Sequence, residues 1–336
     1  MTTTLKISAE SLEALFAALG NSGRRILGPT ATDGRVDLGE VQTPAQVADA
    51  HLQLTLSAKE AVFPRVERLL SYKTRPGKVE LKDAEPEIQP TVLFGLRPCE
   101  ASGFGSLDSV FNWDSRDKFF NARVEQMTVV GLSCTQADDA CFCTSVGGGP
   151  GSTKGSDLLL TPLADGHYLV EILTAKGEAI QALAPHLFQP AVGEDKEALL
   201  AKLEPQFDRG ALTAKLPGLF TSELWAEQSL RCVGCGACAF VCPTCACFDI
   251  QEEADTQEGQ RLRCWDSCGL RQFTLHASGH NPRSAQAERW RQRIYHKFSY
   301  FPQRFGEAMC VGCGKCTRAC PVDMNLKEHL TQASGA

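Results

Sequence analysis

The sequence predicts an α+β protein of two domains, an N-terminal α/β domain over 1–222 and a C-terminal cysteine-rich domain over 223–336. Two observations predict this fold. Between residues 91 and 132, two short apolar runs flank a helical segment, which indicates a βαβ unit and hence a short parallel sheet. Two similar cysteine motifs, each followed by proline, occupy the second domain. A chain of 336 residues is long enough for about two cores.

Composition and charge exclude several classes of protein. Apolar residues make up 43% of the chain and charged residues 22%, as in ordinary globular proteins. A net charge of −6 argues against a nucleic-acid binder, whose affinity depends on neutralising phosphates. No apolar run approaches the roughly 20 residues of a membrane span, and the N-terminus does not resemble a signal peptide. Sixteen cysteines in such a chain indicate metal-bound thiolates in a reducing cytoplasm.

The first elements are predicted as helices. Residues 8–19 have apolar side chains three and four positions apart, with Ser8 as a suitable N-cap. Farther on, the segment 57–71 predicts a helix that Pro64 opens.

The βαβ unit brings two cysteines together. The apolar runs 91–96 and 128–132 predict buried strands, and 101–111 predicts the helix between them. Cys99 and Cys134 follow the two strands directly. Ligands of parallel sheets gather outside the carboxyl ends of the strands, so we expect both thiols at one edge of the sheet.

This edge of the sheet has two interpretations, of which the first is an iron–sulfur site. Cys141 and Cys143 follow shortly, next to a glycine-rich run over 147–151 that allows close wrapping. With Cys99 and Cys134 they would supply four thiolates for a cluster that is independent of the second domain. The alternative is that these four cysteines are small buried residues and surface thiols.

The glycine run lacks the Gly-Lys-Ser/Thr of a Walker loop.

The rest of the first domain predicts a hairpin and helices. Residues 157–174 predict two strands with an Asp-Gly turn between them. Acidic and lysine-containing helical segments follow over 193–215, and a Pro-Gly pair ends the last of them. We therefore expect the domain boundary near Ser222, before a helix that begins at Leu224.

The second domain contains two copies of C-x2-C-x2-C-x3-C-P, the signature of bacterial ferredoxins. In this pattern three close thiolates bind one [4Fe–4S] cluster and the fourth binds the other. The predicted crossed sets are Cys232, Cys235 and Cys238 with Cys320, and Cys310, Cys313 and Cys316 with Cys242. Glycines expected at positive φ, where they let each loop approach the sulfur atoms, are Gly234, Gly236, Gly312 and Gly314.

Other interpretations of the motifs fit less well. A zinc module uses C-x2-C pairs but stops at four ligands and needs no following Cys-Pro. The spacing of Cys238, Cys242 and Cys245 matches that of radical-SAM enzymes, but it lies inside the better ferredoxin match. A dinucleotide-like Gly-x-Gly-x-x-Ala in the same loop has cysteines at its variable positions.

Between the motifs, strands near 247–250 and 261–265 predict a hairpin around an acidic turn, followed by helical segments. The helical part is basic, with Arg283, Arg289, Arg291, Arg293, Lys297 and Arg304. We favour a solvated helix face for these cations. The alternative is that they offset the negative charge of the clusters or dock a partner. Four cysteines remain unassigned, as packing residues or as further cluster ligands: Cys245, Cys247, Cys264 and Cys268.

The chain resembles a known family, which comprises the beta subunit of cytoplasmic sulfhydrogenases and the corresponding iron–sulfur subunit of anaerobic sulfite reductase. Besides the ferredoxin motifs, the most specific matches are Arg97-Pro98-Cys99 and Cys141-Phe142-Cys143. The other matching stretches are 58–64, 95–100, 107–111, 141–145, 242–248, 265–268, 279–281 and 296–298.

This resemblance implies a ferredoxin domain of the α-helical type, two [4Fe–4S] clusters and a third in the N-terminal domain, with no flavin of its own. It implies partners as well: a flavoprotein subunit that binds FAD and NAD(P)H, and a catalytic hydrogenase or sulfite reductase subunit. The predicted function is electron relay between them. The alternatives are an enzyme subunit that reduces a sulfur compound at an atypical cluster, and a ferredoxin-like assembly factor.

Overall fold

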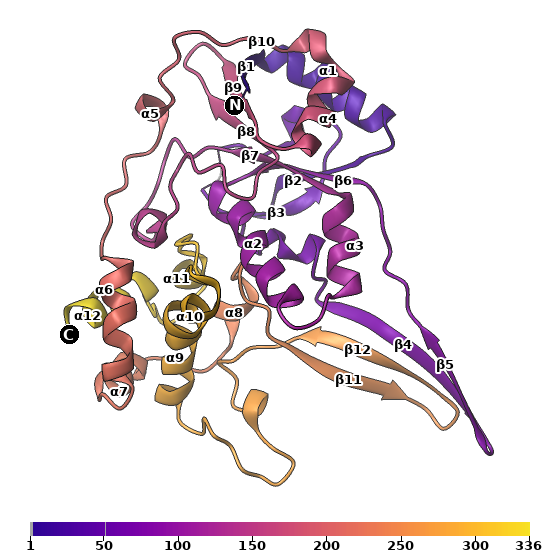
Figure 1. Ribbon diagram of the computed structural model, residues 1–336, viewed down its shortest axis with the longest axis vertical. Helices are drawn as coiled ribbons and strands as arrows, with labels where there is room; N and C mark the ends of the chain where they lie inside the picture. The colour runs from indigo at the N-terminus through magenta and orange to yellow at the C-terminus, as the bar shows by residue number, and fades with distance from the viewer. Residues whose placement is uncertain (1–2, 51) are drawn as a thin grey trace.

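A computed structural model describes residues 3–50 and 52–336 (Figure 1). Most strands form one mixed sheet: β1 (Thr3–Ser8), β2 (Arg25–Thr32), β3 (Arg35–Glu40), β6 (Thr91–Leu96), β7 (Met127–Leu132), β8 (Leu158–Pro162), β9 (His167–Ile172) and β10 (Gln189–Pro190). Their order is β10-β1-β9-β8-β7-β6-β2-β3. β2, β6, β7 and β8 are parallel, and the outer strands pair antiparallel. The predicted βαβ unit and the 157–174 hairpin are therefore confirmed.

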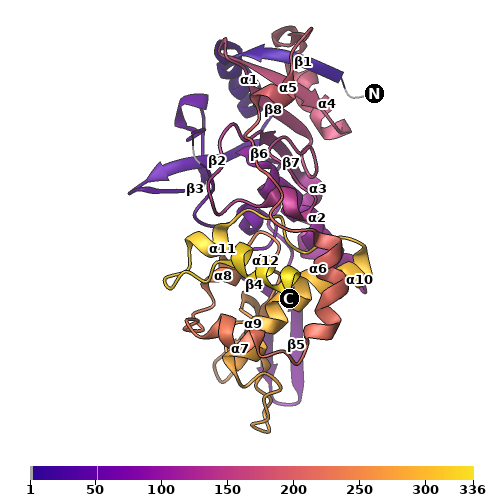
Figure 2. The same ribbon diagram turned by 90° about the vertical axis from the view of Figure 1, so that its left-hand side faces the viewer.

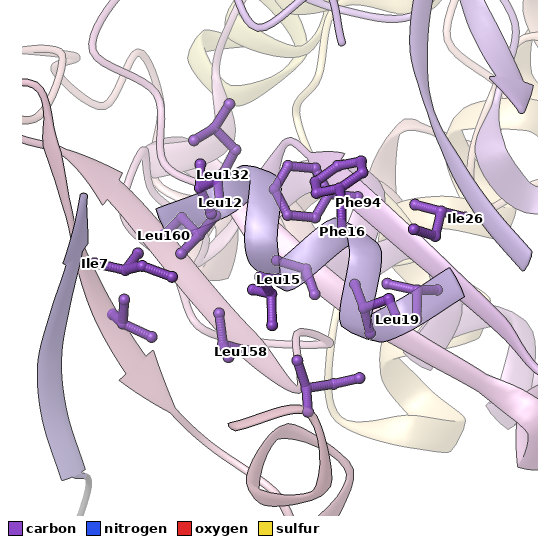
Figure 3. Close-up of a cluster of buried hydrophobic side chains, with 14 of the residues drawn as sticks. Ile7, Leu12, Leu15, Phe16, Leu19, Ile26, Phe94, Leu132, Leu158 and Leu160 are labelled. Carbon is purple, nitrogen blue, oxygen red and sulfur yellow. The ribbon is translucent and has the colours of Figure 1, made fainter. Parts of the chain in front are cut away.

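Helices cover both faces of this sheet (Figure 1). They are α1 (Ala9–Asn21) and α4 (Ala175–Leu183) on one face, and α2 (Pro98–Asn112) and α3 (Lys118–Gln126) on the other. The predicted N-cap of the first helix is confirmed, because the Ser8 hydroxyl accepts the Ser11 N–H at 3.1 Å. On this helix Phe16 packs edge-on against Phe94 of β6, with ring centroids 4.7 Å apart (Figure 3).

A second sheet projects from the body of the molecule (Figure 1). Its strands are β4 (Val66–Arg75), β5 (Lys78–Asp83), β11 (Phe248–Ala254) and β12 (Glu258–Trp265), in the order β11-β12-β4-β5. The helix predicted after Pro64 is wrong, because this stretch forms β4. Its main partner is β12, with Leu70 opposite Arg261, and pairing over such a sequence distance overrides a local helical pattern.

The two predicted domains thus contribute strands to one sheet. β4 and β5 come from the segment before residue 222, and β11 and β12 come from the segment after it. The boundary near Ser222 stays a prediction.

The C-terminal region is mainly helical and lies at the opposite end of the molecule from α1 (Figure 2). Its helices and those leading to it are α5 (Lys196–Leu199), α6 (Arg209–Lys215), α7 (Leu224–Ser229), α8 (Ala237–Phe240), α9 (Gln286–Tyr295), α10 (Phe301–Phe305), α11 (Lys315–Arg318) and α12 (Leu326–Gly335). Their common core includes Trp225, Trp290 and Ile294, together with Phe142 from the N-terminal half. Among the described residues, no helix is both long and apolar enough to cross a membrane.

A buried ion-pair network fixes the base of the projecting sheet. Arg263 of β12 pairs with Glu67 of β4 and with Asp117 at the start of α3, the latter at 2.5 Å. The side chains of Arg263 and Glu67 are each 4% exposed. Glu67 also pairs with Arg123 at 2.5 Å, so this one buried carboxylate compensates two cations. Breaking a buried ion pair of this kind costs about 3–5 kcal/mol.

We therefore predict that Glu67→Gln lowers the unfolding free energy by about 3 kcal/mol. The matched control is Glu252→Gln, which removes the exposed pair with Arg261 in the same sheet and should leave stability nearly unchanged. Anaerobic urea unfolding followed by circular dichroism measures both variants. Equal denaturation midpoints for the two would show that the network contributes no more than a surface pair.

Candidate iron–sulfur centres

The two ferredoxin motifs fold into matching loops. Each loop leads into a short helix, α8 or α11, and these helices lie against each other. Gly234 and Gly236 have φ of 66° and 77°, and Gly312 and Gly314 have φ of 63° and 71°. The predicted positive φ is confirmed at all four glycines, so the sequence repeat is also a structural repeat.

One cavity is lined by the first three thiols of one motif and the last thiol of the other. These are Cys232, Cys235, Cys238 and Cys320, and Cys316 of the second motif also lies in the wall. Gln286 Nε2 donates to Cys232 Sγ at 3.1 Å, and the Met324 N–H donates to Cys320 Sγ at 3.2 Å. Donors aimed at sulfur suit a thiolate-bound cluster, so the surroundings fit the first crossed set.

The second crossed set lies deeper. Its members are Cys242, Cys310, Cys313 and Cys316. Burial raises the pKa of Cys310 to about 11, with Cys242 and Cys316 acting in the same direction and Lys297 opposing them. The pKa of Cys313 is likewise raised by burial, next by Cys99, and also by Cys242 and Cys316. The Thr244 hydroxyl lies 3.2 Å from Cys242 Sγ and donates to the Met309 carbonyl at 2.9 Å, which places Cys242 next to the second motif, as the crossed set requires.

The four thiols predicted for a third site line one cavity at the carboxyl ends of β6 and β7. They are Cys99, Cys134, Cys141 and Cys143. Gln53 Nε2 donates to Cys99 Sγ at 3.0 Å, and Arg318 Nη2 donates to Cys141 Sγ at 3.2 Å. Burial raises the pKa of Cys143 to about 12, and the neighbouring Cys134 and Cys141 act in the same direction.

This third cavity is not independent of the ferredoxin region, contrary to expectation. Gly312 and Cys313 of the second motif complete its wall. The Phe142 N–H donates to the Gly312 carbonyl at 2.8 Å. A Cβ on Gly312 would lie 2.5 Å from the backbone nitrogen of Cys143, so this position needs glycine. A fragment ending near Ser222 would lose part of the site.

The donor atoms of the three sets are all thiols, the ligand type of iron–sulfur clusters. None of the sixteen cysteines forms a disulfide. Within residues 3–50 and 52–336, no three or more Cys, His, Asp or Glu side chains lie close enough to hold a single metal ion. A cubane separates its four thiolates by a core of irons and sulfides, so its ligands are spaced more widely than those of one ion.

The solvated helix face predicted for the basic segment is wrong for its central residues. Arg293 and Lys297 are 4% and 2% exposed, and Arg289 is also buried. Lys297 Nζ donates to Cys242 Sγ at 3.4 Å, and Arg293 Nη1 donates to Cys245 Sγ at 3.5 Å. Spacing could have identified them, because these three cations recur every four residues and so share one helix face.

Sequence reasoning also missed Lys59, which is 3% exposed. Its Nζ donates to the carbonyls of Ala239 and Cys245 at 3.2 and 2.8 Å, and it lies 4.1 Å from the Trp265 ring centroid. Lys59 lies in the stretch 58–64 that carries part of the family resemblance, but a single lysine gives no local signal of these contacts.

The crossed sets make a prediction about single cysteines. Cys320→Ser should change the same cluster signal as Cys235→Ser, because both thiols line one cavity. Cys242→Ser should instead match Cys313→Ser. EPR of the reduced variants, compared pair by pair, measures this. If the Cys320→Ser spectrum matches that of Cys313→Ser, each motif binds its own cluster and the crossed assignment is wrong.

Comparison with known proteins supports a domain for two clusters. The model of a 4Fe–4S dicluster domain matches residues 231–324, which include both motifs. The beta subunit of F420-dependent formate dehydrogenase from Methanocaldococcus jannaschii is 27% identical over 178 residues, 52% of this chain and 35% of its own. Among solved structures, the F420-reducing [NiFe] hydrogenase complex from Methanosarcina barkeri aligns with a TM-score of 0.32 and 11% identity, over 56% of this chain and 80% of that chain, which is too weak to support an argument.

A stronger similarity covers nearly the whole chain. Sulfhydrogenase 2 subunit beta from Pyrococcus furiosus is 30% identical over 334 residues, 97% of this chain and 96% of its own length. The C-terminal region is a domain for two [4Fe–4S] clusters. On this identity and coverage, the chain belongs to the family of the sulfhydrogenase 2 beta subunit.

Proposed function

We propose that this chain relays electrons between an NAD(P)H-linked flavoprotein subunit and a catalytic subunit, either a hydrogenase or sulfur reductase or an anaerobic sulfite reductase. Its relatives are named as beta subunits of a sulfhydrogenase and of a formate dehydrogenase, which supports an iron–sulfur subunit of a larger oxidoreductase. The flavoprotein, which would carry FAD, and the identity of the catalytic subunit belong to the proposal. So does a cytoplasmic location, which the sixteen free cysteines favour.

One observation carries the proposal: the three thiol sets lie next to one another in space. Cys313 of the second set lines the cavity of the third set. Cys316 of the second set lines the cavity of the first set. The first set reaches the surface at Cys235, which is exposed. Three clusters held in this way would form one path through the molecule, as an electron relay requires.

The bound clusters would supply one-electron storage, and the protein would supply ligands, charge compensation and hydrogen bonds. The proposed ligands of the ferredoxin region are the two crossed sets, and those of the third [4Fe–4S] cluster are Cys99, Cys134, Cys141 and Cys143. Lys297 and Arg318 each donate toward a thiol of these sets. Hydrogen bonds and positive charge at the sulfur atoms stabilise a reduced cluster, so these side chains would set the potentials along the relay.

The test of this function separates relay from catalysis. The isolated holoprotein should contain no flavin and should not be reduced by NAD(P)H, because the chain has no credible dinucleotide-binding turn after a strand. Dithionite should reduce it, and NAD(P)H should do so only when the flavoprotein partner is added. Bleaching of the cluster absorbance under anaerobic conditions measures both reactions.

Stoichiometric FAD in the purified chain, or direct bleaching by NAD(P)H, would contradict the relay. Polysulfide and sulfite provide the second comparison. If either reoxidises the reduced isolated chain at a catalytic rate or changes a cluster spectrum by binding, the chain reduces a sulfur compound itself. The relay predicts that both leave the spectra unchanged.

A further inference from the structure

A cavity outside the three thiol sets lies between the end of α2 and the helical run that follows α9. Its volume is about 570 Å³, within the range of small-molecule sites in proteins. No cysteine lines it. The side chains of its wall that carry the following argument are Trp113, His296, Tyr300, Phe301, Arg304 and Phe305. Aromatic walls with a few polar groups are typical of ligand sites.

The helix that forms one wall departs from α-helical geometry. α9 continues into α10 through a π-helical turn, His296–Tyr300, in which the Phe301 N–H donates to the His296 carbonyl five residues back. Pro302 in the next turn has no N–H to donate, which interrupts the α-helical pattern. Both ends of the π-helical turn, His296 and Tyr300, line the cavity. Such turns are frequent at functional sites.

The aromatic walls present flat ring faces at an open mouth. Trp113 is 57% exposed and Tyr300 is 41% exposed, which is unusual for such large rings. Phe301 and Phe305 pack against each other with ring centroids 4.5 Å apart and extend the aromatic wall. Exposed rings of this kind bind planar heteroaromatic groups by stacking.

Arg304 supplies positive charge at this mouth. Its guanidinium carbon lies 3.5 Å from the Trp113 ring centroid. Within residues 3–50 and 52–336, no carboxylate forms an ion pair with Arg304, and the nearby Glu307 pairs with Lys154 instead. A guanidinium stacked on a ring keeps its in-plane N–H groups free, and their geometry matches that of a phosphate.

His296 supplies a neutral polar group on the inner side of the cavity, where it is half-buried. Burial lowers its pKa to about 4, and the nearby Lys297 and Arg283 act in the same direction. In the part of the chain that the structure describes, its ring has no hydrogen-bond partner. A neutral imidazole both donates and accepts, so it suits the polar edge of a heteroaromatic ring.

We propose that this cavity binds a nucleotide, a planar heteroaromatic ring that carries a phosphate. The ring would stack on the exposed aromatic faces with its polar edge toward His296, and the phosphate would bind Arg304. Flavin and adenine nucleotides share this chemistry. The site is separate from the cluster ligands and does not depend on the relay function. Because its mouth is open, binding is reversible and no nucleotide needs to accompany the purified chain.

The experiment titrates the anaerobically purified holoprotein with FMN and, separately, with AMP, followed by calorimetry. Riboflavin and adenosine are the uncharged counterparts. We expect at least one nucleotide to bind at one site per chain, and its counterpart to bind about tenfold more weakly or less, because charge-assisted hydrogen bonds to the phosphate are lost. The stronger of the two nucleotides identifies a flavin or an adenine site.

Two variants locate the binding. Arg304→Gln and Trp113→Ala should each weaken it about tenfold, through the phosphate and through stacking respectively. The matched control is Arg75→Gln, which changes an exposed arginine at the end of β4 and should bind as the wild type does. The iron content of each variant shows whether its clusters are intact. If Trp113→Ala loses them, Tyr300→Ala gives the same readout.

Absence of binding by both nucleotides at millimolar concentration would overturn the proposal. Equal affinity for a nucleotide and its uncharged counterpart would overturn it too, since the phosphate would then contribute nothing. Unchanged affinity in the variants with intact clusters would show that the ligand binds elsewhere.

Discussion

Buried positive charge among cysteine thiols is the constraint on which the C-terminal half depends. Lys59, Arg293 and Lys297 are almost inaccessible, and the groups around them are thiols and carbonyl oxygens. Burial alone would lower the pKa of Lys297, yet the thiols of Cys242 and Cys245 raise it above its usual value. An unpaired buried ion costs several kcal/mol, so this arrangement is stable only with anions among the thiols. Thiolate-bound clusters are such anions, which links the folding of this half to its cofactors.

The same constraint explains why the two halves of the chain interlock. Lys59 comes from the N-terminal half but hydrogen-bonds to the loop that carries Cys245. Lys315, within the second motif, forms a buried ion pair with Glu100 in the first turn of α2. Gly312 packs on the backbone of Cys143. The N-terminal sheet is therefore a support that holds one thiol set against the ferredoxin loops, and the three sets become neighbours.

How well the sequence predicts a feature depends on how far apart in the sequence the interacting residues lie. The ferredoxin loops, the βαβ unit and the cap at Ser8 depend on residues a few positions apart, so local patterns identified them. The strand β4 was predicted as a helix; it lies between β5, its hairpin neighbour, and β12, which is far away in sequence and sets much of its pairing. The position of Cys264 opposite Asp249 depends on how the hairpin pairs. Burial of Arg293 is a tertiary property, although its four-residue spacing from Arg289 and Lys297 was a usable signal.

If the three thiol sets hold neighbouring clusters in one path, as we propose, the clusters should interact magnetically in the fully reduced protein. EPR of the wild type should show spectra broadened by magnetic interaction between adjacent clusters. The double variant Cys141→Ser/Cys143→Ser should lose about four irons, and its spectrum should simplify to that of the ferredoxin pair. A wild-type spectrum that is the simple sum of isolated clusters, or a double variant with unchanged iron and spectrum, would contradict the account.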